Sequence, residues 1–561
     1  MRGVAQTVAL ALGTLGLERR QRAPGPPSES RDVARQPHRR RAYPWRVAGR
    51  GDVTDQRWDG AGRRAAIPLA LLVLALLVRA HALGAQSLWF DEAWQVWYSS
   101  LPVRTIVTLL PQNDTAPPLY YALLHGWMGL VGRSEVAVRF PSTLLGALAV
   151  PLVYAVGRDV AGRSVALLAA LLVLVNPFHI WYSQEARAYA PVATVALGAA
   201  WCAVRWVETA RPRWGVLVAI ADVVLLYAQS TALLFVAAQV AYVGVALARR
   251  YAGAWDGSVR ARARARALWP VAAALALWLP WVPSLLRQQA HGQTDWIPYV
   301  TLGDGLDFLR QGTGTGRWLP LPGQDGVRYG VEALLLVLAA LSLRKGWREA
   351  LLLLGPALLL FTLALHAHVW APRAALVAVF GLALLAARGL TRLPRAATLG
   401  LAGVVVAINL ATLTHGPTRA PWRELAALLC AQARPGDVLA VAPPYTVAAL
   451  AYYTVDRRCP AVILSPRYRL PATWRSFRDA YFLSPMQQDE AAWLHGAGPA
   501  SAAGVARRLA AGRARLWIVG YDGATGPDAA PLFAVQDRPS ILFRQGGLVL
   551  ARSRISAVRA G

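Results

Sequence analysis

The chain has 561 residues, of which 56% are hydrophobic and only 16% are charged, whereas soluble globular proteins carry about 25% charged residues. Its net charge is +29, and its three cysteines are too few for a disulfide scaffold. The apolar fraction excludes a disordered chain, and its concentration in long runs predicts a polytopic membrane protein. The positive charge would also suit a nucleic-acid-binding protein, which the placement of the arginines tests.

The N-terminal part, residues 1–64, is rich in Arg, Pro, Gly and Ser, a composition typical of a disordered tail. It contains one apolar stretch, Val8–Leu17, which is followed by charged residues and by no small-residue cleavage site. We therefore interpret this stretch neither as a signal peptide nor as a membrane span.

Residues 65–414 contain eleven apolar segments, comparable in length to the ~20 residues that a helix needs to cross a bilayer. The predicted spans are approximately Ala65–Leu83, Val136–Val156, Val165–Tyr182, Tyr189–Trp206, Trp214–Gln229, Thr231–Ala248, Ala267–Leu286, Gly330–Leu343, Ala350–His366, Ala374–Ala387 and Ala396–Leu413.

Arginine is concentrated in alternate loops between these segments, for example in the run Arg249–Arg266 and around Arg211 and Arg388. Because basic loop residues stay on the cytoplasmic side, the N-terminus is predicted to be cytoplasmic and the first long loop, residues 84–135, to lie outside. An odd number of spans also places the chain after residue 414 outside. The excess charge therefore indicates topology and contact with anionic membrane lipids, not nucleic acid.

Residues 415–561 are expected to fold as a small extracytoplasmic α/β domain, because apolar β-type runs alternate with helical patterns. The runs are Asp437–Ala442, Ala461–Leu464, Leu516–Val519 and Leu548–Ala551, and the helical pattern is Trp422–Ala433. Cys430 and Cys459 both fall in this domain, where they are either disulfide-bonded or separate buried thiols. No motif here indicates what the domain does.

The first outer loop carries the strongest candidate for chemistry. Asp91 and Glu92 lie together in Ser87-Leu-Trp-Phe-Asp-Glu-Ala-Trp, just beyond the first predicted span. An adjacent carboxylate pair in an apolar interfacial setting favours the raised pKa of a general base. The same residues could instead form a helix cap within a belt of interfacial aromatic residues. Later in the loop, Asn113-Asp-Thr-Ala-Pro-Pro-Leu-Tyr-Tyr places a rigid Pro-Pro step before a predicted membrane-surface helix.

A second polar cluster, Tyr182-Ser-Gln-Glu-Ala-Arg-Ala-Tyr, lies in a short outer turn after the third span. Its Glu185 and Arg187 are predicted to lie on the same side of the membrane as the first outer loop. The planar guanidinium of Arg187 suits a phosphate group, although the turn could simply keep its charges out of the lipid. Arg139 and Arg373 also enter spans from the outer side, where each either faces the bundle interior or reaches the interface.

In this order, the motifs resemble those of the bacterial GT-C superfamily of glycosyltransferases. The resemblance is to the protein O-mannosyltransferase-like enzymes, which include the lipid A aminoarabinose transferase. The matching motifs are Leu88-Trp-Phe-Asp-Glu-Ala, Asp114-Thr-Ala-Pro-Pro-Leu-Tyr-Tyr, Glu135-Val-Ala-Val-Arg-Phe-Pro-Ser and Asn176-Pro with Tyr182-Ser-Gln-Glu-Ala-Arg-Ala-Tyr. Weaker agreement continues at Ala371-Pro-Arg-Ala and Pro421-Trp-Arg-Glu-Leu-Ala.

The resemblance implies a GT-C-like fold and the transfer of a sugar from a polyprenyl-phosphate donor to a hydroxyl acceptor. It implies that Asp91 is the catalytic base and that Glu92 supports it, by orienting the loop or by contacting the acceptor. Asp114 would shape the donor or metal site, and the donor's sugar-phosphate would lie near Glu185, Arg187 and Arg373. The candidate substrate-binding set is completed by Tyr120, Tyr121, Arg139 and Tyr189. Lipid, polysaccharide and protein acceptors all fit.

One departure from the family bears on metal binding. Relatives often have a Tyr-Thr-His-like step near the fifth span, whereas this chain has Tyr227-Ala-Gln-Ser. The missing histidine argues against a metal ligand there, so no metal-binding residue is assigned, although a divalent metal stays an open alternative. The expected chemistry is one inverting displacement with a lipid phosphate as leaving group and without a second, nucleophilic carboxylate.

Two other functions stay open at this point. A transporter or flippase of lipid-linked sugars would also be polytopic, but no internal repeat relates the two halves of the chain. A GT-C-type polysaccharide ligase would use the same donors without needing the Asp-Glu loop motif. The resemblance and the predicted topology imply a bacterial cytoplasmic membrane, and the predominance of arginine and alanine is typical of proteins from GC-rich genomes.

Overall fold

The computed structural model describes part of the chain. The described residues are 61–250, 257–290, 294, 297–314, 325–415, 419–434, 437–442, 446–454, 459, 462–464, 515–521, 540–545 and 548–553. The predicted disordered tail, with its apolar stretch Val8–Leu17, therefore lies outside the described residues up to residue 60.

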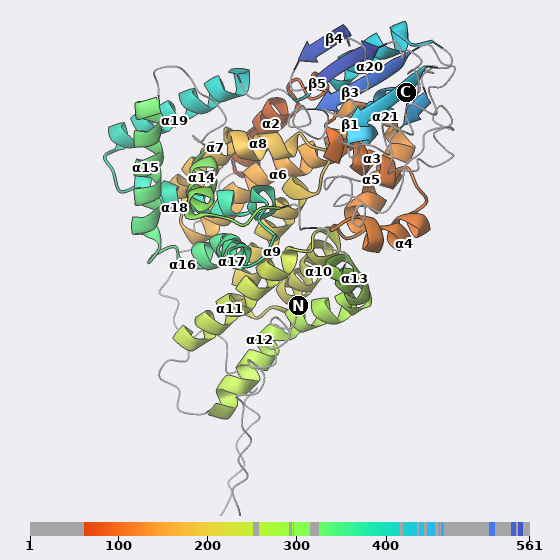
Figure 1. Cartoon of the computed structure of the whole chain (residues 1–561). Helices are drawn as coiled ribbons and strands as arrows, with labels where there is room; N and C mark the ends of the chain where they lie inside the picture. Colours follow the sequence, from red (N-terminus) through yellow and green to blue (C-terminus); the bar gives the residue numbers. More distant parts are fainter. Residues whose placement is uncertain are drawn as a thin grey trace, which may run out of the picture. The chain divides into compact units, whose positions relative to one another are not determined.

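Helices make up most of the described chain before residue 433 (Figure 1). The first are α2 (Ala61–Ala80), α3 (Phe90–Ser99), α4 (Val103–Asn113), α5 (Leu119–Val131), α6 (Glu135–Val160), α7 (Arg163–Leu174), α8 (Pro177–Ser183), α9 (Tyr189–Thr209), α10 (Pro212–Ala228) and α11 (Ala232–Arg250). Then follow α12 (Gly257–Trp278), η1 (Leu279–Trp281), α13 (Val282–Ala290), α14 (Leu302–Thr313), α15 (Asp325–Ser342), α16 (Trp347–Glu349), the π-helical turn η2 (Ala350–Leu354), α17 (Gly355–Ala364), η3 (Pro372–Ala375), α18 (Ala378–Leu390), α19 (Arg395–His415), α20 (Trp422–Gln432) and α21 (Val447–Thr454).

Each of the eleven predicted spans contains a helix in the structure. Among the described residues, five helical stretches are long and apolar enough to cross a membrane, and α7 with α8 makes a sixth if this bent pair is one span. The five are Glu135–Val160, Tyr189–Thr209, Ala232–Arg250, Ala265–Ala290 and Trp347–Ala364. The mostly helical, multi-pass class is confirmed, whereas the number of eleven spans stays a prediction.

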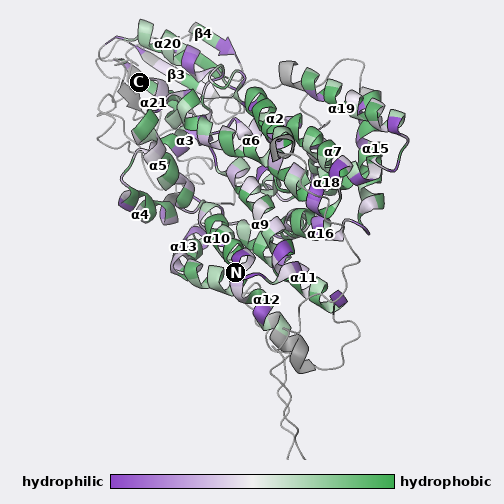
Figure 2. Ribbon diagram, turned by 180° about the vertical axis from the view of Figure 1, so that it is seen from behind, coloured by the Kyte–Doolittle hydropathy of each residue, from purple (hydrophilic) through white to green (hydrophobic). Residues whose placement is uncertain are grey.

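Many helices consist largely of hydrophobic residues (Figure 2), and a number of these residues are exposed. Leu77 of α2, Leu358 of α17 and Leu399 of α19 each expose more than 60% of their surface. Exposed apolar area on this scale is unfavourable in water, and it is what contact with lipid requires.

A break in the third predicted span is stabilised by a buried arginine. The axes of α7 and α8 differ by 61°, because Pro177 has no backbone N–H and starts a new helix. At the break, Arg79 of α2 donates to two carbonyls, at 3.0 Å to Val173 and 3.3 Å to Leu174. The turn that follows α8, which carries Glu185 and Arg187, is thereby held close to α2.

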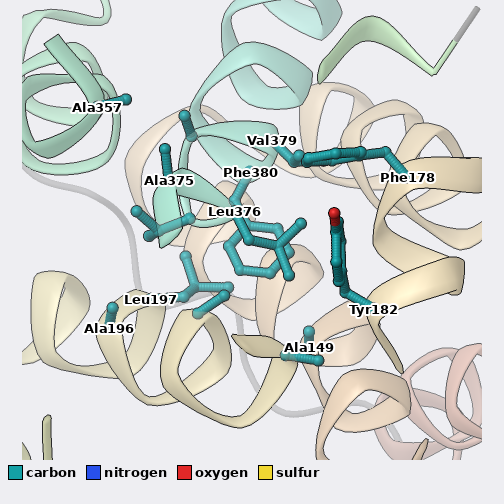
Figure 3. Packing of buried hydrophobic residues seen from close by; sticks show 14 of the residues in the cluster. Ala149, Phe178, Tyr182, Ala196, Leu197, Ala357, Ala375, Leu376, Val379 and Phe380 are labelled. Atoms are coloured by element: carbon teal, nitrogen blue, oxygen red, sulfur yellow. The ribbon is translucent and has the colours of Figure 1, made fainter. Parts of the chain in front are cut away.

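The core of the bundle forms around α18, whose side chains are almost all buried. Figure 3 shows Leu376 and Phe380 packed beside Tyr182 of α8 and Leu197 of α9. Arg373, in the short helix η3 just before α18, is therefore fixed to the best-packed part of the molecule.

The described residues of the C-terminal segment 415–561, called the outer segment after its predicted side of the membrane, form a five-stranded sheet with the order β2-β1-β3-β5-β4. The strands are β1 (Val438–Ala442), β2 (Val462–Leu464), β3 (Leu516–Tyr521), β4 (Ser540–Gln545) and β5 (Leu548–Ser553). β1 pairs in parallel with β2 and β3, and β5 pairs antiparallel with β3 and β4. The four predicted strands and the predicted helix at residue 422 are all present, and β4 is an additional strand.

The two outer cysteines are joined, since Cys430 of α20 and Cys459 form a disulfide with a Cα–Cα distance of 4.7 Å. Cys459 follows α21 by five residues, so the bond ties α20 to the chain just after α21. Cys202, in α9, is a free thiol.

The pairing can be tested by counting thiols. We expect one cysteine, Cys202, to react with an alkylating agent in denaturant without reductant, and all three to react after reduction, because the disulfide blocks the other two. Mass spectrometry of the intact protein gives the count directly. Three modified cysteines in freshly purified, unreduced protein would contradict the bond.

The close packing of α18 against α15 can be tested by substituting a glycine at their contact. A Cβ on Gly389 of α18 would lie 2.6 Å from both the Cβ and the carbonyl oxygen of Leu338 in α15, whereas a Cβ on Gly400 of α19 would meet nothing within 4 Å. Gly389→Ala should therefore destabilise the protein by about 1–3 kcal/mol through overpacking. Gly400→Ala is the matched control and should change stability by at most about 1 kcal/mol, in the favourable direction. Thermal unfolding midpoints in one detergent compare the two variants, and equal midpoints would be inconsistent with the packing.

Candidate active site

The Asp-Glu motif occupies the first turn of α3, where negative charge is favoured by the helix dipole. Successive side chains on a helix point about 100° apart, so the two carboxylates separate. The Glu92 side chain is fully buried, whereas the Asp91 side chain is 19% exposed. The sequence pair is therefore one buried carboxylate and one that solvent or substrate can reach.

Glu92 is bound on all sides by donors. Arg139 donates to both of its oxygens, at 2.8 and 2.7 Å, Arg419 lies at 2.6 Å, and the backbone N–H of Ala186 donates at 2.9 Å. Burial alone would raise the pKa of Glu92, but the charges of Arg139 and Arg419 and these hydrogen bonds lower it to about 2. For Glu92, the raised pKa expected from the carboxylate pair is therefore wrong, because the sequence does not show the two arginines that surround it.

Glu185 is the carboxylate whose pKa is raised. It lies in the turn between α8 and α9, is 1% exposed, and contacts Arg419 at 3.5 Å. Burial raises its pKa to about 7, although Arg419 partly opposes the effect. Glu185 is therefore a group that can hold a proton near neutral pH.

Asp91 lies beside two arginines that share one hydroxyl. Its Oδ2 is 3.5 Å from a terminal nitrogen of Arg373. Arg373 donates to the hydroxyl of Tyr189 at 2.9 Å, and Arg187 donates to the same hydroxyl at 3.2 Å. Tyr189 and Asp91 raise the pKa of Arg373 in spite of its burial, and burial of Arg187 is likewise outweighed by Tyr189 and Asp91, which raise its pKa. Both guanidinium groups are therefore charged and converge next to Asp91.

Several polar atoms around Asp91 have no hydrogen-bond partner among the described residues. They are the Oδ2 of Asp91, which accepts no hydrogen bond, the indole nitrogen of Trp89 and the amide nitrogen of Gln95. Gln95 follows Asp91 by one helical turn, and its amide oxygen is 3.4 Å from Arg187. Buried polar atoms are nearly always hydrogen-bonded, so unpartnered ones gathered on one face indicate the place of a polar ligand. The sequence did not single out Gln95.

The residues around the Pro-Pro step form hydrogen bonds with one another and with the segments next to the site. Asp114 accepts hydrogen bonds from the hydroxyl of Tyr121 and from the backbone N–H of Ala116, the latter at 3.0 Å. The hydroxyl of Tyr120 is 2.7 Å from that of Ser142, which donates to the carbonyl of Arg187 at 2.8 Å. These side chains order the loop and the turn beside the two arginines, and their contact with substrate stays a prediction.

The outer segment contributes contacts that the sequence did not predict. Besides Arg419, Arg423 of α20 forms an ion pair with Glu135 at 2.7 Å. Tyr453 of α21 accepts a hydrogen bond at 2.7 Å from the backbone N–H of Leu88, three residues before Asp91. The motif Pro421-Trp-Arg-Glu was the available signal, but it does not show what the arginine contacts.

No group of three or more His, Cys, Asp or Glu residues within the described part of the chain could hold a metal ion. Gln229, from the step Tyr227-Ala-Gln-Ser, instead donates to the carbonyl of Ala374 at 3.4 Å. It thereby contacts the backbone of the residue next to Arg373.

A small apolar cavity lies between helices next to Tyr189, whose hydroxyl accepts hydrogen bonds from both arginines. Its lining includes Tyr189, Ala196, Leu225, Phe235 and Leu360. Ala374 also lines it, so the cavity adjoins the short helix that carries Arg373.

Part of the chain matches a known protein family. Residues 115–281 match the family model "Dolichyl-phosphate-mannose-protein mannosyltransferase". The match includes Tyr120, Tyr121, Arg139, Glu185, Arg187 and Tyr189, but neither the Asp-Glu motif, Asp114 nor Arg373. No curated protein sequence matches the chain.

Among solved structures, the chain is similar to ArnT from Cupriavidus metallidurans bound to undecaprenyl phosphate, with a TM-score of 0.52 and 14% identity, over 90% of this chain and 100% of ArnT. The apo form of the same ArnT has a TM-score of 0.53 and 14% identity, over 88% of this chain and 98% of that one. The expected resemblance to GT-C glycosyltransferases is thereby confirmed. Residues 115–281 are thus similar to the dolichyl-phosphate-mannose-protein mannosyltransferase family, and the chain as a whole has the fold of ArnT.

Proposed function

We propose that this protein transfers a sugar from a polyprenyl-phosphate donor to an acceptor hydroxyl, with Asp91 as the general base. The observation that carries the proposal is the position of Asp91, whose unpartnered oxygen lies 3.5 Å from Arg373, beside the guanidinium of Arg187. A proton acceptor and two cations at one place match the two charges that a displacement at a sugar-phosphate bond develops.

The donor phosphate would bind to Arg187 and Arg373. Their planar guanidinium groups can each donate two hydrogen bonds to phosphate oxygens. Neither has a carboxylate partner closer than 3.5 Å among the described residues, so their charge is available to the leaving phosphate. The ArnT structure similar to this chain is bound to undecaprenyl phosphate, which supports a lipid phosphate as the ligand here.

The lipid part of the donor would lie near the apolar side chains around Tyr189. Tyr189 lines a small, mostly apolar cavity and accepts hydrogen bonds from both arginines, so a phosphate on the arginines places its hydrocarbon chain beside apolar side chains. A lipid-linked donor explains both the charged and the apolar part of the site, whereas a nucleotide sugar would explain only the charged part.

The reaction would be a single displacement. Asp91 takes the proton of the acceptor hydroxyl, the hydroxyl oxygen forms a bond to the anomeric carbon, and the bond from that carbon to the phosphate oxygen breaks with inversion. Negative charge on the leaving lipid phosphate is matched by Arg187 and Arg373. Glu92 has the supporting role, because its buried carboxylate accepts bonds from Arg139 and Arg419 and cannot reach the acceptor.

The predicted topology puts this site on the outer face of a bacterial cytoplasmic membrane, with the N-terminus in the cytoplasm. The sugar is not identified by any contact in the structure, and lipid, polysaccharide and protein hydroxyls all suit a base of this kind.

The role of the base is tested by Asp91→Asn. We expect transfer from a panel of undecaprenyl-phosphate sugars to fall by about 10²–10⁴-fold, the contribution of general-base catalysis. Binding of undecaprenyl phosphate should stay within about threefold of wild type, because the arginines are intact. Asp159→Asn, at the far end of α6, is the matched control. Transfer at the wild-type rate by Asp91→Asn would exclude this mechanism, and no transfer by the wild type to any acceptor would favour a transporter.

The role of the cations is tested by Arg373→Gln and Arg187→Gln. Each removes a charged hydrogen-bond donor worth about 1.5–3 kcal/mol, so undecaprenyl phosphate should bind roughly 10–100-fold more weakly. Arg104→Gln removes the same charge from an exposed residue of α4 and should bind normally. Unchanged affinity in both site variants, measured by titration in detergent, would show that the phosphate binds elsewhere.

A further inference from the structure

Arg419 lies between α19 and α20, at the start of the outer segment, yet its side chain is only 6% exposed. A buried charge is costly unless it is paired and hydrogen-bonded. The partners of Arg419 therefore show what its position is used for.

One set of partners belongs to the first outer loop. A terminal nitrogen of Arg419 lies 2.6 Å from the Oε2 of Glu92, and its backbone N–H donates to the side chain of Gln86 at 3.0 Å. Glu92 is the residue after Asp91, so these two contacts hold both ends of the short segment that leads into the proposed base.

The other set belongs to the turn between α8 and α9. The second terminal nitrogen of Arg419 donates to the carbonyl of Gln184 at 3.3 Å and lies 3.5 Å from the carboxylate of Glu185. Its guanidinium also stacks over the ring of Trp181, at 4.8 Å from the ring centre. This turn continues directly into Arg187, one of the two cations proposed for the donor phosphate.

One guanidinium thus joins the segment that carries the base to the segment that carries a phosphate-binding cation. A planar group with donors on separate nitrogens can span two such segments, and a lysine ammonium on a flexible stem cannot do so equally well. The neighbouring contacts of Arg423 with Glu135 and of Tyr453 with Leu88 hold the same loop from the same side.

We propose that Arg419 is a positioning residue for sugar transfer, which sets the distance between Asp91 and the Arg187 turn and makes the start of the outer segment a component of the active site. The inference rests on the proposed function and adds to it a residue that does not touch the substrate. Displacement of a catalytic group by about 1 Å can cost about 100-fold in rate, so a link between these two segments has a large effect on turnover.

The test compares Arg419→Gln and Arg419→Lys with the wild type in the full-length protein. For transfer from undecaprenyl-phosphate sugars, we expect Arg419→Gln to lower kcat by about 100-fold. Arg419→Lys keeps the charge but loses the second set of contacts, so its kcat should be intermediate, within about tenfold of wild type. Affinity for undecaprenyl phosphate should stay within about twofold in both, because Arg187 and Arg373 are intact. A purely structural role would instead reduce binding and turnover together.

Hydrogen–deuterium exchange gives a readout that needs no substrate. In Arg419→Gln, amides of residues 86–92 and 181–187 should exchange at least about tenfold faster, because the link between the two segments is lost. Arg544→Gln, which removes an exposed arginine from β4 of the same outer segment, is the matched control and should behave as wild type in both assays. If Arg419→Gln cannot be purified folded, Arg419→Lys alone still decides, by faster exchange at residues 181–187.

Wild-type turnover and wild-type exchange in Arg419→Gln would overturn the inference. Loss of lipid-phosphate binding in proportion to the loss of turnover would also overturn it. If the wild type transfers no sugar, the proposed function fails, and the exchange experiment still shows whether Arg419 links the two segments.

Discussion

The arrangement of the site depends on the buried carboxylate of Glu92. Removing a carboxylate from water costs several kcal/mol, and losing one partner of a buried ion pair costs about 3–5 kcal/mol, so this side chain is stable only while its donors surround it. Those donors come from three separate parts of the chain: Arg139 of α6, the backbone of Ala186 and Arg419. Glu92 therefore brings together a transmembrane helix, an outer turn and the outer segment, and it orients the neighbouring Asp91.

The charges around Asp91 differ from those around Glu92 in one respect. Glu92 accepts hydrogen bonds from several protein donors, whereas the Oδ2 of Asp91 and the amide nitrogen of Gln95 have no hydrogen-bond partner among the described residues. Beside Asp91, the amide nitrogen of Gln95 and the two guanidinium groups can donate hydrogen bonds to a ligand, and phosphate oxygens would accept them. The surroundings of Glu92 are fixed by protein contacts, and the surroundings of Asp91 would be completed by the ligand. Charges held in place before the ligand binds are what electrostatic catalysis requires.

Local sequence patterns were sufficient to predict the helices and strands, but not the contacts between residues that are far apart in the sequence. Apolar runs predicted helices at every proposed span, and β-type runs predicted four of the five strands, because both depend on neighbours in the sequence. The motif around Asp91 was also visible, since its residues are adjacent. The separation of Asp91 from Glu92 follows from helix geometry once α3 is known to begin there. The low pKa of Glu92 could not be predicted, because it depends on Arg139 and Arg419, 47 and 327 positions away.

The long separation between Glu92 and its last partner bears on how the protein is made. Tyr453, which binds the backbone of Leu88, is tied through α21 and the disulfide to α20, and all of these follow the last membrane helix. During synthesis the proposed base emerges early, but the residues that hold its loop emerge only near the end. A chain that is released prematurely contains Asp91 and the arginine pair on an unbraced loop. An incomplete chain therefore lacks the contacts that hold the loop of the proposed base.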